Sequence, residues 1–136
     1  MSAAYRVHSQ LGPGLFEKPY KECLCHTLRR DNIPFETEKV LPVVYDGLII
    51  PIGYKIDLLV DDAVIVEIKS VENILPVHEQ QLLTYLRLSR KSVGLLINFN
   101  VARLKYGIHR RVNGYAGLDV GPPEAGRAAG KGDQNT

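Results

Sequence analysis

The chain has 136 residues, of which 45% are hydrophobic and 24% are charged. This length corresponds to one domain that can bury a core without disulfides or a structural metal. Seventeen Lys and Arg residues against fifteen Asp and Glu residues leave a net charge of +2, which is too small to indicate nucleic-acid binding by itself. No apolar run approaches the ~18 residues of a membrane helix, and the first residues lack the pattern of a secretory signal.

The two cysteines, Cys23 and Cys25, are separated by one residue. In a helix, side chains two apart point to different sides, so a disulfide between them is geometrically poor. A zinc site would need further Cys or His residues at ligand spacing, and the sequence has none. We therefore expect reduced thiols, which suit a cytoplasmic protein.

The first third of the chain predicts two helices. Residues 1–11 form the first, which Gly12 and Pro13 end. Apolar residues at three- and four-residue steps predict the second over residues 15–31. Its regular part is expected to begin near Lys18, because Pro19 is tolerated only in a first turn.

Three strands are predicted next, with turns at residues 46–47 and 61–62. Pro42 in the first strand indicates a sheet edge or a bulge. The third strand is apolar on both faces, which is typical of a central strand. The predicted ranges are 35–45, 48–60 and 64–69.

The remaining predicted elements are a helix, a buried strand and a short last strand. They cover residues 77–89, opened by Pro76, then 92–99 and 107–112. The order predicts an α/β (α+β) domain with an α-β-β-β-α-β core and a mixed sheet, with a right-handed crossover where strands are parallel. Gly, Pro, Ala and polar residues dominate the end of the chain, so we expect a domain over residues 1–115 and a disordered tail over 116–136.

Charged residues interrupt two of the apolar strands. Glu67 and Lys69 are two apart and project from one sheet face. A three-residue turn at 61–63 would place Asp57 opposite Glu67 on that same face, whereas a two-residue turn would put Glu67 on the other face. Two carboxylates beside an ammonium are the groups that metal-assisted phosphodiester hydrolysis needs. The alternatives are a buried ion pair or two exposed edge residues.

Basic residues cluster after position 86. On one side of the fold they would form a positive stripe, and otherwise they are an ordinary solvated face. They are Arg87, Arg90, Lys91, Arg103, Lys105, Arg110 and Arg111.

Several blocks of the sequence resemble one known family. The segment Gly14-Leu15-Phe16-Glu17-Lys18-Pro19-Tyr20 resembles the naming motif of the GxxExxY family, a small branch of the PD-(D/E)XK nuclease superfamily. Further blocks resemble its lead-in, its second and core strands, its second helix and its next strand. These are residues 7–14, 53–60, 64–69, 78–86 and 94–99, and the resemblance covers about residues 3 to 112.

The resemblance implies a fold and a site. The superfamily core is α-β-β-β-α-β, with a central mixed sheet flanked by helices. Its metal ligands fall on Asp57 and Glu67, and its catalytic lysine falls on Lys69. Glu17 corresponds to a helix carboxylate that joins the site, although a carboxylate at a helix start is also stabilised by the helix dipole alone. Pro19 is unusual within the motif and is expected to shift Glu17 relative to the sheet.

Other residues carry weaker expectations. Gln81 and Tyr85 match the superfamily's Q-x-x-x-Y pattern and share a helix face, so they orient the lysine, contact the substrate, or only pack the helix on the sheet. Tyr20 is expected to be a core or hydroxyl-bonding residue. His8 and His78 are expected to be structural or surface residues, with metal ligation or acid–base chemistry as the alternative.

The resemblance implies a Mg²⁺-dependent nuclease that hydrolyses DNA phosphodiester bonds, with Mn²⁺ as a substitute. Nucleic acid, most simply DNA, is the expected partner, with no membrane association. A homodimer stays open, because small nucleases of this superfamily commonly dimerise. One alternative is a catalytically silent nucleic-acid-binding or assembly module on the same fold. Another is a metal-dependent hydrolase of nucleotides.

Overall fold

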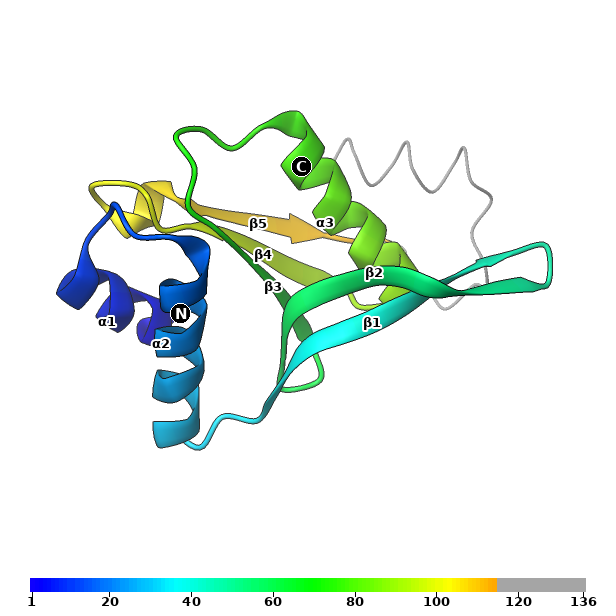
Figure 1. The fold of residues 1–136 in the computed structure, drawn as a ribbon, viewed down its shortest axis with the longest axis horizontal. Helices are drawn as coiled ribbons and strands as arrows, with labels where there is room; N and C mark the ends of the chain where they lie inside the picture. Colours follow the sequence, from blue (N-terminus) through cyan, green and yellow to red (C-terminus); the bar gives the residue numbers. More distant parts are fainter. Residues whose placement is uncertain (115–136) are drawn as a thin grey trace.

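The computed structural model describes residues 1–114, and its element order matches the predicted one (Figure 1). The expected disordered tail and the domain end at residue 115 lie outside the described residues. Helix α2 includes Pro19 in its first turn, as its position in the sequence required. The elements are α1 (Ser2–Leu11), α2 (Glu17–Arg30), β1 (Phe35–Tyr45), β2 (Leu48–Val60), β3 (Val64–Lys69), α3 (Pro76–Ser89), β4 (Val93–Asn98), the 3₁₀ turn η1 (Leu104–Tyr106) and β5 (Ile108–Val112).

The strands form one mixed sheet in the order β1-β2-β3-β4-β5. Strands β3 and β4 are parallel, and α3 connects them, whereas the other neighbours are antiparallel. The sheet is flanked by α1 and α2 on one face and by α3 on the other (Figure 1). The predictions of a mixed sheet, a central β3 and an edge at β1 are therefore confirmed.

Each sheet face packs its own apolar core. Val66 and Ile68 of β3 pack with Leu24 and Leu28 of α2. Ile65 packs on the opposite face, in the cluster that α3 covers. Even-numbered residues of β3 therefore face α2, and odd-numbered residues face α3.

The hairpin of β1 and β2 has an irregular middle and a tight tip. Asp46 and Gly47 adopt positive φ values of 50° and 79° between the paired residues Tyr45 and Leu48, as two-residue hairpin turns require. The pairing register shifts between Leu41 and Val43, which confirms the bulge predicted at Pro42. A Cβ on Gly53 would lie 1.6 Å from the Leu41 carbonyl oxygen, so this close approach of the strands requires glycine.

Tyr20 fixes the loop that leads into α2. Its ring is fully buried and stacks on Phe99 with centroids 4.6 Å apart. Its hydroxyl donates to the Gly12 carbonyl at 2.5 Å and accepts from the Leu15 N–H at 3.2 Å. The Ser70 hydroxyl donates to the Leu15 carbonyl from the other side. The start of α2 is therefore tied to the sheet, and the expectation for Tyr20 is confirmed.

The histidines in question have structural contacts. A ring nitrogen of buried His8 lies 2.8 Å from the Val101 carbonyl oxygen, and Nδ1 of His78 accepts from the Leu75 N–H at 3.0 Å. Both cysteines are free thiols. Within residues 1–114, no helix has the length and apolarity needed to cross a membrane.

We predict that Tyr20→Phe lowers the free energy of unfolding by roughly 1–2 kcal/mol, because it leaves the Gly12 carbonyl without its hydroxyl partner while keeping the stacked ring. Urea unfolding followed by circular dichroism measures the change. Tyr106→Phe is the matched control, since Tyr106 is 69% exposed and should leave stability unchanged. Equal stabilities for both variants would contradict a role for the Tyr20 hydroxyl.

Candidate active site

The candidate site lies where β2 and β3 separate. Leu58, Leu59 and Val60 pair with Val66, Ile65 and Val64, and the turn between the strands has three residues. Of the two turn lengths that the sequence left open, the structure has the three-residue turn, and its register brings Asp57 opposite Glu67. Before residue 58, β2 continues in register with β1 and not with β3. We call the point of separation, at Asp57 and Glu67, the fork.

Side chains replace backbone pairing at the fork. The Asp57 N–H donates to a Glu67 carboxylate oxygen at 2.9 Å. The Ile68 N–H donates to an Asp57 carboxylate oxygen at the same distance. Each carboxylate therefore bonds the backbone of the other strand, and this reciprocal pair fixes both acidic groups at the fork.

The expectation that Asp57, Glu67 and Lys69 share one sheet face is met only in part. Glu67 and Lys69 fall on the α3 side of β3, but Asp57 lines a cleft on the α2 side together with Ile68. Ile56 and Leu59 both pack in the cluster under α3, so β2 does not alternate regularly between them. Because β2 is irregular at the fork, the period-two rule placed Asp57 on the wrong face.

Glu67 is a buried carboxyl group beside a second carboxylate. It is only 5% exposed. Burial raises the pKa of Glu67 to about 8, and the Asp57 carboxylate adds to the rise. The hydrogen bond from the Asp57 N–H and the charge of Lys69 act in the opposite direction. Glu67 therefore lacks enough positive charge around it to stabilise its ionised form.

Lys69 and Tyr85 are the neighbours of this carboxyl group. Half-buried Lys69 ends β3, and its carbonyl accepts from the Phe99 N–H at 2.9 Å. Burial raises the pKa of Tyr85 to about 12, and the carboxylates of Glu67 and Asp57 add to the rise. Tyr85 thus keeps its proton at neutral pH near the acidic pair. Gln81 is half-buried one turn earlier on α3, which places it on the same helix face.

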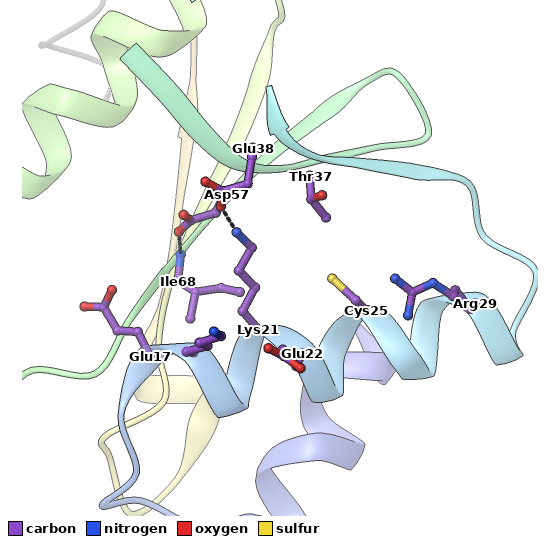
Figure 2. A pocket seen from close by; sticks show the side chains of 10 residues that line it. Glu17, Lys21, Glu22, Cys25, Arg29, Thr37, Glu38, Asp57 and Ile68 are labelled. Atoms are coloured by element: carbon purple, nitrogen blue, oxygen red, sulfur yellow. Dashed lines mark hydrogen bonds and ion pairs between the residues drawn. The ribbon is translucent and has the colours of Figure 1, made fainter. Parts of the chain in front are cut away.

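Glu17 lines the same cleft as Asp57. The cleft has a volume of about 600 Å³ and lies between α2 and the strands β1, β2 and β3 (Figure 2). Glu17 is the first residue of α2, and Pro19 does not remove it from the cleft. The full lining is Glu17, Lys18, Lys21, Glu22, Cys25, Arg29, Thr37, Glu38, Asp57 and Ile68.

The sequence analysis identified Glu17 and Asp57 but missed the other five charged residues of this lining, among them Lys21 and Glu38. Lys21 follows Glu17 by one helical turn and forms an ion pair with Glu38 across the cleft (Figure 2). Glu38 adopts φ 54°, which is unusual for a residue within a strand, and it stands opposite Asp57 in the register of β1 and β2. The spacing of Glu17 and Lys21 on one helix face was a signal that could have indicated Lys21.

Some of the basic residues after position 86 are neutralised by ion pairs. Arg111 pairs with Glu79, and Lys91 pairs with Asp62. The cations near the candidate site instead come from α2, namely Lys18, Lys21 and Arg29.

The fork offers a metal ion two carboxylates. Across residues 1–114, no group of three or more His, Cys, Asp or Glu side chains is placed to hold a metal. Asp57 and Glu67 are nevertheless the oxygen ligands that Mg²⁺ prefers, and Mg²⁺ usually binds through one or two carboxylates with water and phosphate oxygens completing its shell. A divalent cation would also offset the repulsion between the buried Glu67 carboxylate and the half-buried Asp57 carboxylate. The residues at the fork therefore fit a hard divalent cation.

We predict that the metal-free protein loses stability as pH rises from about 5 to 8. The unfolded chain releases the Glu67 proton near pH 4.5, whereas the folded protein holds it to about pH 8, so the stabilisation by that proton disappears across this window. Glu67→Gln should remove this part of the pH dependence and raise Tm at pH 8 by ~5 °C or more. Thermal unfolding in EDTA at several pH values measures it.

The control for this series is Glu72→Gln, at an exposed position. It should keep the pH dependence of the native chain. Adding Mg²⁺ at pH 8 should raise the Tm of the native chain and leave that of Glu67→Gln nearly unchanged. The same fall in stability for native chain and Glu67→Gln would mean that another group causes it.

The comparisons with known proteins agree with this geometry. The family model for the PD-(D/E)XK nuclease superfamily matches residues 1–111, which include all the elements of the fork, the cleft and α3. Neither the search of curated proteins nor the search of solved structures found a match. Nucleases of this superfamily generally use divalent metal ions. Since the match spans most of the chain, the protein belongs to the PD-(D/E)XK nuclease superfamily.

Proposed function

We propose that this protein is a Mg²⁺-dependent nuclease that hydrolyses DNA phosphodiester bonds with a metal-activated water. The observation that carries the proposal is the reciprocal pair of hydrogen bonds between Asp57 and Glu67 at the fork. It fixes two carboxylates at the fork, with Lys69 near Glu67 and with Asp57 lining a charged cleft. Superfamily membership supports the nuclease class.

We assign Asp57 and Glu67 to the metal. When bound there, Mg²⁺ would polarise a phosphate oxygen and lower the pKa of a bound water. Lys69 holds a positive charge next to the pair, so it orients the attacking water and offsets charge on the phosphate. Glu17, at the rim of the cleft, accepts a hydrogen bond from water or substrate.

Gln81 and Tyr85 support the lysine and the substrate from α3. Tyr85 keeps its hydroxyl proton at neutral pH and lies close to the acidic pair, so it acts as a donor. Gln81 lies one turn away on the same face. We assign both residues to orienting Lys69 or the substrate. Neither is assigned a proton-transfer role.

The net charge of the cleft supports an order of binding in which the metal ion binds before the nucleic acid. Four carboxylates, from Glu17, Glu22, Glu38 and Asp57, face three cations, from Lys18, Lys21 and Arg29. A polyanion such as DNA is repelled by this excess until a divalent cation reverses it. The three cations on α2 then line the wall along which a phosphate backbone can lie.

Two narrower assignments rest on the resemblance. The resemblance of the Gly14 to Tyr20 segment supports assignment to the GxxExxY branch, and the Tyr20 hydroxyl bonds to Gly12 and Leu15 and the position of Glu17 in the cleft give that motif a physical purpose. The free thiols fit a cytoplasmic location.

A second candidate is a catalytically silent nucleic-acid-binding module. The ion pair between Lys21 and Glu38 across the cleft favours it. Such a module would bind DNA with an affinity that falls as salt rises. Its binding would be indifferent to Lys69→Ala.

We predict that Lys69→Ala lowers metal-dependent DNA cleavage by a factor on the order of 10² or more, because it removes the positive charge beside the water. The assay uses duplex, single-stranded and flapped DNA with Mg²⁺ or Mn²⁺, and EDTA should abolish cutting. Asp57→Asn should abolish it as well.

Lys105→Ala, an exposed change in η1, is the matched control and should cut normally. Circular dichroism confirms that each variant folds. Cleavage that survives Lys69→Ala and Asp57→Asn would overturn the assigned mechanism. A folded native chain that binds DNA but never cuts would favour the silent module.

A further inference from the structure

The hairpin formed by β1 and β2 carries an apolar extension beyond the sheet. We call residues 40–54 the arm. Figure 1 shows it extending past α3, away from the helices. Its fifteen residues include one charged residue, Asp46, and no Lys or Arg. The arm is thus much less charged than the chain as a whole, which is 24% charged.

Both faces of the arm expose apolar side chains. Val44 and Ile49 are paired on one face and are 61% and 63% exposed. Tyr45 and Leu48 are paired on the opposite face and are 71% and 59% exposed. Antiparallel sheets that meet water normally place polar residues on the wet face. A two-stranded hairpin of this kind is also only marginally stable by itself.

We infer that the arm is a self-association surface and packs against the arm of a second copy of this chain. A two-fold axis brings a patch against its own copy, so an uncharged apolar patch is complementary to itself without any matching of charges. The absence of Lys and Arg in the arm argues against DNA or an anionic lipid surface as its occupant.

The exposed area suits a dimer. Seven apolar residues of the arm are at least 40% exposed, and together they expose on the order of 700 Å² over its two faces. An arm-to-arm contact that covers both faces would therefore approach the ~800 Å² per partner of a standard protein interface. Patches of several hundred Å² on a small protein usually mark a contact surface. The seven are Val40, Val44, Tyr45, Leu48, Ile49, Ile50 and Tyr54.

The inference does not depend on catalysis, because the arm lies outside the cleft lining. It has one structural consequence for the site. Strand β2 carries both the arm and Asp57, so arm pairing would hold two forks in a fixed relation within one particle.

Sedimentation velocity of the full chain from about 1 to 100 µM tests the inference. The native chain should sediment as a particle of twice the 15.2 kDa chain mass. Ile49→Lys and Leu48→Lys place a charge on opposite faces of the arm tip. At least one of them should raise the dimer dissociation constant by 100-fold or more and give the monomer.

Val77→Lys is the matched control, because Val77 is 64% exposed on α3 and lies off the arm. It should leave the dimer intact, and circular dichroism should show all three variants folded. A native chain that stays monomeric at 100 µM overturns the inference, as does a dimer that neither arm variant weakens. An open-ended assembly, or binding of the native arm to neutral lipid vesicles in place of dimer formation, also overturns it.

Discussion

The reciprocal hydrogen bonds between Asp57 and Glu67 are the interaction on which the candidate site depends. Backbone groups inside a fold need partners, and a strand that leaves its neighbour gives those partners up. Here β2 turns from β3 at the fork, and the two carboxylates bond the N–H groups of Asp57 and Ile68. The acidic side chains therefore compensate for an interruption in the sheet.

Much of this arrangement could be predicted from the sequence. The turn near residues 61–62 and the bulge at Pro42 could be predicted, because turns and proline act through local chemistry, whereas the turn length that sets the register of the acidic pair stayed open between two and three residues. The face of Asp57 could not be predicted. The period-two rule assumes a regular strand, whereas Ile56 and Leu59 pack on the same side of β2. No local sequence feature of that segment indicates the residue at which β2 ceases to pair with β3.

The cleft shows a second limit of sequence reasoning. In the sequence, the charged residues on one face of α2 have the pattern of a solvated helix face. Only the packing of α2 against the sheet shows that this face lines the cleft. Tyr20 and Ser70 fix that docking through the loop before the helix. Glu17 and Lys21 thereby become lining residues of the cleft. Helical spacing could place Lys21 beside Glu17 on one helix face, but it could not show that this face lines a cleft, since the docking depends on contacts far apart in the chain.

Strand β2 also joins the site to the arm. Tyr54 at the base of the arm lies with its ring centroid 5.6 Å from that of Tyr85, and Tyr85 lies within the field of Glu67 and Asp57. A change at Tyr54 would therefore disturb both the arm and the fork. Leu48 and Ile49 lie at the far end of the strand and pair with β1 alone. Because those two positions lie at the end of β2 away from Asp57, changes there separate association from chemistry, whereas a change at Tyr54 does not.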